Sequence, residues 1–221
     1  MRLSVRAVLF DLDGTLIDSA PDLAGTANDM RLSRGLHALP YEAFRPLVGS
    51  GARGMMSAAF DAAPGDPGFA ALRDEFLSRY EQRMTQESSV FADIWPPLAA
   101  LDAIGCPWGI VTNKAMRFSD PLVRALQLYS RASVLIAGDS TPHAKPHPAP
   151  LIEAALRIGV DPRDCAYVGD DLRDVIAGRS AGMTTIAVRW GYLGLGDPIE
   201  AWGADHIADS PADVLKHLAM A

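Results

Sequence analysis

Five short apolar runs alternate along this chain with segments that have the pattern of helices, and each run ends in a polar residue. The runs are residues 8–10, 108–111, 134–137, 166–168 and 184–188. Near-continuous apolar runs of this length are typical of parallel strands covered on both faces. Candidate helices lie between them, at about 96–104, 115–128, 148–158 and 171–181. The alternation predicts an α/β fold with a doubly wound, Rossmann-like parallel sheet.

The region from about 19 to 88 interrupts this alternation, because it contains no convincing strand. Ser19 and Asp22, three residues apart with Pro21 between them, have the spacing of a capped helix start. A second, amphipathic helix is predicted by apolar residues three and four apart: Phe69, Leu72, Phe76 and Tyr80. We therefore expect a helical insertion over 19–88 within a core formed by residues 1–18 and 89–221.

The composition argues against several classes of function. With 20 basic and 27 acidic residues the net charge is −7, so the chain lacks the broad basic field typical of nucleic-acid and anionic-membrane binding. No stretch approaches the roughly 18 apolar residues of a membrane span, and the first apolar run stops at Asp11, so we expect no signal peptide and a cytoplasmic location. Cys106 and Cys165 are too few for a disulfide framework, and we expect reduced thiols.

Polar residues follow the first two predicted strands, at the edge of the sheet where such folds bind ligands. Asp11 and Asp13 directly follow the first strand, with Gly14, whose backbone can approach a bound phosphate. The alternative is a solvated turn. Thr112 and Asn113 follow the second strand, where a hydroxyl and an amide could bind phosphate oxygens. The alternative there is an N-cap of the next helix.

Two further motifs follow later strands. Lys145 lies in a proline-stiffened loop, where its ammonium could be held at a fixed point, although a solvated loop lysine is the alternative. Asp170, Asp171 and Asp174 crowd one strand end, with helix capping as the alternative. Two unit charges about 4 Å apart cost roughly 4 kcal/mol at an effective dielectric of 20. If these acids meet the first two aspartates a cation is needed, and carboxylate oxygens suit Mg²⁺.

As a set, and in this order, the four motifs resemble those of the haloacid dehalogenase (HAD) superfamily, and the resemblance covers essentially the whole chain. The 19–88 insertion is similar to the helical cap of its phosphoglycolate phosphatase-like members. The resemblance implies that Asp11 is the nucleophile that forms an aspartyl-phosphate. It implies that Asp13 protonates the leaving oxygen and then activates water, and that Thr112 and Lys145 hold the phosphoryl group.

The resemblance also implies a Mg²⁺ cofactor, held by Asp11, by the backbone carbonyl of Asp13 and by Asp170. Asp174 and Asp171 would contact the residues that bind the metal rather than the metal itself. Asp171 occupies a position that is often Ser or Thr in relatives. Asp13 favours a phosphatase over a dehalogenase, since a halide leaving group needs no proton. Phosphomutases keep both aspartates and stay open as an alternative. A phospho-receiver domain would not explain the insertion, and a silent binding protein would not explain an intact set of catalytic positions.

Substrate choice is expected to lie in the cap, where Ser50, Gly51 and Arg53 form a flexible turn with a hydroxyl, free amides and a cation. The alternative is a plain loop between helices. Residues 50–53, 108–114, 169–174 and 202–205 resemble bacterial N-acetylmuramic acid 6-phosphate phosphatases. The expected partner is thus a small phosphomonoester, either 2-phosphoglycolate or N-acetylmuramic acid 6-phosphate. Each carries a carboxylate that Arg53 could bind.

Overall fold

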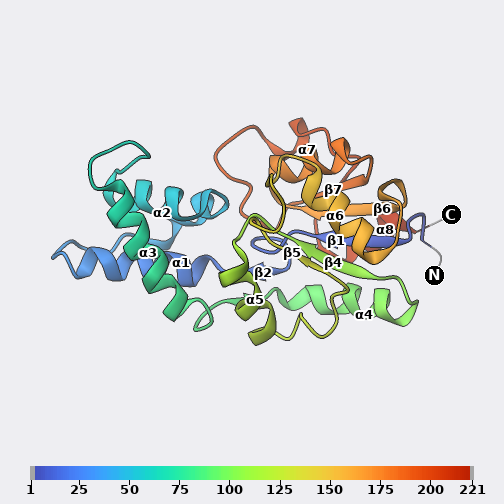
Figure 1. Cartoon of the computed structure of the whole chain (residues 1–221), viewed down its shortest axis with the longest axis horizontal. Helices are drawn as coiled ribbons and strands as arrows, with labels where there is room; N and C mark the ends of the chain where they lie inside the picture. The colour runs from blue at the N-terminus through green and yellow to red at the C-terminus, as the bar shows by residue number, and fades with distance from the viewer. Residues whose placement is uncertain (1–2, 220–221) are drawn as a thin grey trace.

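The computed structural model describes residues 3–219 of the chain, and its centre is a six-stranded parallel sheet (Figure 1). The chain runs from the central β1 to β4 and β5 on one side, and then to β6, β7 and β8 on the other, in the order β5-β4-β1-β6-β7-β8. The predicted doubly wound α/β fold is therefore confirmed. The strands are β1 (Ala7–Phe10), β4 (Trp108–Val111), β5 (Leu135–Ile136), β6 (Cys165–Gly169), β7 (Thr184–Val188) and β8 (His206–Ala208).

Helices cover both faces of this sheet, because alternate residues of each strand point to opposite sides. Val8 and Phe10 of β1 join one apolar cluster, and Ala7 and Leu9 join another. Figure 1 shows α7 above the sheet and α4 and α5 below it, and the apolar clusters place α6 on the same face as α7. The first cluster is closed by α4 (Trp95–Ala103), α5 (Met116–Ala125) and α8 (Pro211–Leu218), and the second by α6 (Ala149–Ile158) and α7 (Leu172–Ser180).

Three further helices form a separate lobe at one end of the molecule, which we call the helical lobe (residues 19–88; Figure 1). They are α1 (Ala20–Leu32), α2 (Gly51–Phe60) and α3 (Phe69–Arg83). The lobe has its own apolar cluster, which includes Phe76 and Tyr80 of the predicted amphipathic helix. Two short antiparallel strands, β2 (Ile17–Asp18) and β3 (Ser89–Val90), join it to the sheet.

Short 3₁₀ helices occupy several of the connections. They are η1 (Tyr41–Ala43), η2 (Arg45–Ser50), η3 (Ala92–Ile94), η4 (Pro162–Asp164) and η5 (Ile199–Ala201). Cys106 and Cys165 are free thiols, as expected. None of the helices within residues 3–219 combines the length and the apolar character needed to cross a bilayer.

The first helix of the lobe begins where the sequence predicts, but the predicted capping interaction is wrong. Ser19 does not cap the helix with its side chain, and its hydroxyl pairs instead with the Asp13 carboxylate. The carboxylate of Asp22 is fully buried and accepts hydrogen bonds from the backbone N–H groups of Glu87 and Ser88 and from the Ser88 hydroxyl. Both side chains satisfy distant partners, which a local spacing rule cannot anticipate.

Candidate active site

The predicted site residues meet at the carboxyl edge of the sheet, around the central strand β1. Asp11 follows β1, Thr112 follows β4 and Asp170 follows β6, and all three are buried. The ladder fixes their backbone: the Asp11 N–H donates to Val168 at 2.9 Å, and the Thr112 N–H donates to Ile136 at 2.9 Å. These strand ends form one wall of a cavity of about 270 Å³, and the helical lobe forms another.

Three buried carboxylates form the negative centre of this cavity. Asp11, Asp170 and Asp174 each offer an oxygen, and the three oxygens lie within 4.8 Å of one another. Burial, opposed by Lys145, raises the pKa of Asp11 to about 7. Burial, reinforced by the charges of Asp11 and Asp174, holds the pKa of Asp170 well above its usual range. Such a cluster is costly without a compensating cation.

Lys145 is buried against this cluster, so the solvated-loop alternative does not describe it. Its ammonium lies 2.8 Å from Asp11 Oδ1 and 2.7 Å from Asp174 Oδ1, and it donates to the Tyr167 hydroxyl at 2.8 Å. Burial would lower the pKa of Lys145, but the two carboxylates outweigh it and raise the pKa to about 12. The side-chain amide of Asn113 fixes the Lys145 backbone, donating to its carbonyl and accepting from its N–H, each at 2.9 Å.

Asp170 is held on both of its oxygens. Oδ1 accepts from the Thr15 hydroxyl at 2.9 Å, and Oδ2 accepts from the Tyr192 backbone N–H at 2.8 Å. Two glycines make room for this carboxylate: a Cβ at Gly14 would lie 2.2 Å from Oδ2, and one at Gly191 would lie 2.2 Å from the Asp170 Cβ. Because Gly14 has no side chain, the Asp170 carboxylate can lie directly against its backbone.

Asp171 and Asp174 form a reciprocal capping box at the start of α7. The Asp171 carboxylate accepts from the Arg173 backbone N–H at 2.8 Å and pairs with its guanidinium at 2.7 Å. Although burial opposes it, this pairing lowers the pKa of Asp171. The capping interpretation is confirmed, and it is compatible with a place at the cavity, because Asp174 also contacts Lys145.

Asp13 lies beside the carboxylate cluster and is only half-buried. Its Oδ1 accepts from the Lys114 ammonium at 2.9 Å and is also the partner of the Ser19 hydroxyl. The Lys114 ammonium lies 4.9 Å from the centre of the Tyr80 ring of α3. Burial opposes it, but Asp13 and Tyr80 together raise the pKa of Lys114 above its usual range.

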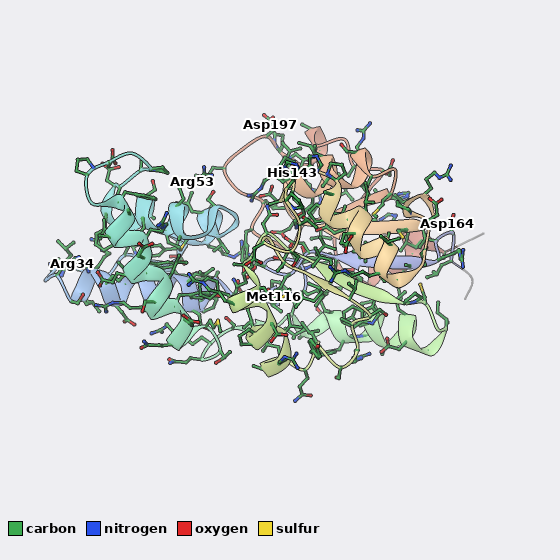
Figure 2. The ribbon with its side chains drawn as sticks, in the orientation of Figure 1. Arg34, Arg53, Met116, His143, Asp164 and Asp197 are labelled. Carbon is green, nitrogen blue, oxygen red and sulfur yellow. The ribbon has the colours of Figure 1, made fainter. Side chains whose placement is uncertain are left out.

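The structure brings together most of the predicted site residues. Around the cavity are Asp11, Asp13, Thr112, Asn113, Lys145, Asp170, Asp171 and Asp174, with Ser50 and Gly51 from the lobe. Two predicted residues do not line the cavity: Gly14, which lies against Asp170, and Arg53, which is exposed on α2 (Figure 2).

Sequence reasoning missed three residues that the structure places at the cavity. Lys114 and Arg173 lie inside motifs that were singled out, so their position next to Asn113 and Asp171 was a usable signal. Tyr192 has no local signal, since its role depends on Asp170, 22 residues away.

Comparisons with known proteins show which family the chain belongs to. A family model described as haloacid dehalogenase-like hydrolase matches residues 5–182. The chain is 41% identical over 217 residues to an N-acetylmuramic acid 6-phosphate phosphatase of Pseudomonas aeruginosa, covering 98% of this chain and 96% of the relative. It is 46% identical over 210 residues to a phosphoglycolate phosphatase of Xanthomonas campestris pv. campestris, covering 93% of each.

A crystal structure described as a predicted phosphoglycolate phosphatase from Haemophilus somnus superimposes with a TM-score of 0.86 at 29% identity, covering 98% of this chain and 99% of that chain. The chain therefore belongs to the haloacid dehalogenase-like hydrolase family and is an enzyme of the phosphatase type.

Proposed function

We propose that the chain hydrolyses small phosphomonoesters with the help of Mg²⁺, through an aspartyl-phosphate on Asp11. One observation carries the proposal: a buried lysine and a buried threonine face a cluster of three carboxylates inside one cavity. A phosphate ester bound there meets a nucleophile, a fixed positive charge and a half-buried carboxyl group together.

In the first step Asp11 attacks phosphorus, and the bond from phosphorus to the ester oxygen breaks. A proton from the Asp13 carboxyl goes to the leaving oxygen. In the second step water attacks phosphorus while one of its protons goes to the Asp13 carboxylate, and the bond from phosphorus to the Asp11 oxygen breaks. Phosphate then leaves, and Asp11 is restored. Lys145 and Thr112 hold the phosphoryl oxygens, and the Asn113 amide keeps Lys145 in place.

The donor set fits Mg²⁺. Asp11 Oδ1 is buried without an aligned hydrogen-bond donor, and its neighbours at Asp170 and Asp174 add negative charge that Lys145 alone does not balance. Asp11, Asp170 and the carbonyl of Asp13 would hold the ion, with Asp174 behind them. The ion would neutralise charge on the phosphate oxygens.

We also propose that the helical lobe is a cap that selects the substrate, and that residues 1–18 and 89–221 are the catalytic core. Ser50 and Gly51 reach the cavity from the lobe, so they are placed to contact the part of the ester beyond the phosphate. The relatives named above point to 2-phosphoglycolate or N-acetylmuramic acid 6-phosphate, both of which carry a carboxylate.

The test is phosphate release from these two esters, side by side, with Mg²⁺. A kcat/KM preference for one identifies the substrate class, and Asp11→Asn is expected to lower turnover by at least about 10³-fold. Normal turnover by Asp11→Asn would remove the nucleophile assignment. Because Arg53 lies outside the cavity, we expect Arg53→Ala to change KM equally for the carboxylate-bearing esters and for an aryl phosphate, and a rise in KM confined to the carboxylate-bearing esters would restore Arg53 as a specificity residue.

The metal is tested separately. Chelation with EDTA should abolish turnover, and added Mg²⁺ should restore it. Mg²⁺ should also raise the melting temperature of the wild type, since it binds only the folded state. Asp170→Asn should lose that shift. Asp164→Asn, a matched change at an exposed carboxylate far from the helical lobe (Figure 2), should keep it. Equal shifts in the two variants would place the ion elsewhere.

A further inference from the structure

We propose that Lys114 is a positioning residue for the proton transfers of Asp13, and that Tyr80 of the helical lobe holds Lys114 in that role. The inference rests on the proposed function, because it concerns how Asp13 protonates the leaving group. It is carried by the contacts of one carboxylate oxygen, by the burial of Lys114 and by the elements that surround it.

Both contacts of the Asp13 carboxylate are made by Oδ1. The Lys114 ammonium donates to it at 2.9 Å, and the Ser19 hydroxyl is its second partner. An ammonium has no acceptor capacity, so Oδ1 must be the acceptor in this pair. Oδ2 makes no hydrogen bond within residues 3–219, so it is the oxygen that can carry a proton toward a substrate.

The Lys114 ammonium is enclosed rather than solvated. Its side chain is 9% exposed, and its backbone is tied down because its N–H donates to the Thr112 hydroxyl at 3.1 Å and its carbonyl accepts from the Gly138 N–H at 2.9 Å. Its distance from Asp13 is therefore set by the β4 end and by the loop after β5. A freely solvated lysine would pay side-chain entropy for such a contact.

Tyr80 closes the other side of Lys114. Its ring lies 4.9 Å from the ammonium, in the range of a cation–π interaction. Tyr80 is itself fixed between Phe76 of the lobe, at 6.1 Å, and Phe118 of α5, at 5.6 Å. The helical lobe thus contributes one aromatic side chain to the environment of the residue that holds Asp13.

The chemical consequence concerns the leaving group. Because the Lys114 ammonium engages Oδ1, it fixes the orientation of the Asp13 carboxyl group and leaves Oδ2 as the oxygen that gives its proton to the leaving group. Lys114 therefore acts by positioning the proton donor toward the departing oxygen. An ester whose leaving group is already acidic needs this proton less than one that departs as a basic alkoxide or phenoxide.

The experiment compares phenyl phosphate with 4-nitrophenyl phosphate, which share a ring and differ in the acidity of the departing phenol. The quantity is kcat/KM, because it includes the step in which the leaving group departs. For the Lys114→Met variant we expect kcat/KM for phenyl phosphate to fall by a factor at least about tenfold larger than the fall in kcat/KM for 4-nitrophenyl phosphate. Lys114→Arg should recover part of the difference, since it restores the charge.

Three controls make the result specific. Lys216→Met changes an exposed lysine of α8 and should leave both rates unchanged. In an Asp13→Asn background Lys114→Met should add no further discrimination between the esters, because the residue acts through Asp13. Tyr80→Leu should lower the ratio of kcat/KM for phenyl phosphate to kcat/KM for 4-nitrophenyl phosphate, as Lys114→Met does. Tyr80→Phe keeps the aromatic ring and should leave this ratio unchanged.

Equal losses for the two esters, or a rise in KM alone, would overturn the inference and make Lys114 a substrate contact or a structural residue. If the wild type released no phosphate from either aryl ester, from 2-phosphoglycolate or from N-acetylmuramic acid 6-phosphate with Mg²⁺, the proposed function itself would fail. The two failures are therefore distinguishable.

Discussion

At the scale of single residues, the site depends on positions that have no side chain. Gly14 has a φ of +88°, and a Cβ there would lie 2.2 Å from Asp170 Oδ2. Such a contact is too close for any carboxylate to tolerate, so either Asp170 or the β1 loop would have to move. The geometry of the carboxylate cluster is therefore set partly by the absence of a methyl group.

Gly14→Ala is expected to weaken Mg²⁺ binding at least tenfold, in addition to a loss of about 1 kcal/mol from the left-handed backbone. Gly35→Ala is the matched control, because its φ of +72° imposes the same backbone cost while nothing lies within 4 Å of the added methyl. Calorimetric titration with Mg²⁺ and the melting temperature measure the two effects. Unchanged Mg²⁺ affinity in Gly14→Ala would show that the Asp170 position tolerates displacement.

At the scale of elements, the helical lobe is anchored by one buried charge. Asp22 of α1 accepts from the Ser88 N–H and hydroxyl, each at 2.7 Å, and from the Glu87 N–H at 3.1 Å. It thereby joins the first turn of α1 to the segment by which the chain leaves the lobe. Replacing a buried, fully bonded carboxylate leaves its donors without a charged acceptor.

Asp22→Asn is expected to lower the free energy of unfolding by about 2–4 kcal/mol. Asp29→Asn, seven residues along the same helix, removes a half-exposed partner of Arg83 and should cost less than about 1 kcal/mol. Urea denaturation measures both. Similar losses in the two variants would contradict the anchoring role of Asp22.

The same scale shows what the sequence could and could not predict. The inner strands were predictable because two-sided burial makes them continuously apolar. The edge strand β8 was missed, since His206 and Ile207 are only half-buried and carry no such run. The pair β2 and β3 was missed because each has two residues. Lys145 and the aspartates were predictable from their place after strands, whereas the contact of Arg173 with Gly49 and the role of Tyr192 depend on partners far along the chain.

At the scale of the whole molecule, the lobe and the sheet are joined by contacts at the rim of the cavity. Arg173 of α7 donates to the Gly49 carbonyl at 2.5 Å, and Arg45 of the lobe donates to the Gly191 carbonyl at 3.0 Å. The Arg45 guanidinium also lies 5.2 Å from the Tyr192 ring. Arg173 belongs to the sheet region and contacts the lobe, whereas Arg45 belongs to the lobe and contacts the sheet region. Together they hold the lobe over the cavity.

Replacing both Arg45 and Arg173 by Met is expected to raise the radius of gyration and to raise KM several-fold, because the lobe loses its contacts with the rim. Small-angle scattering and steady-state kinetics with Mg²⁺ measure the two effects. Arg157→Met is the control, since among residues 3–219 this arginine forms its ion pair with Glu153 on the surface of α6. An unchanged radius of gyration in the double variant would show that other contacts hold the lobe in place.

Tyr192 has a wider consequence. Its backbone N–H holds Asp170 at 2.8 Å, and its hydroxyl accepts from the N–H groups of Ser19 and Ala20 at 2.9 and 3.1 Å. One residue thus touches both a carboxylate of the site and the point where the lobe begins. If a ligand that restrains Asp170 also restrains that point, thermodynamic reciprocity requires that the orientation of the lobe change the affinity for that ligand by the same factor. In that case the affinity for the ion depends on the orientation of the lobe, and the orientation of the lobe depends on whether the ion is bound.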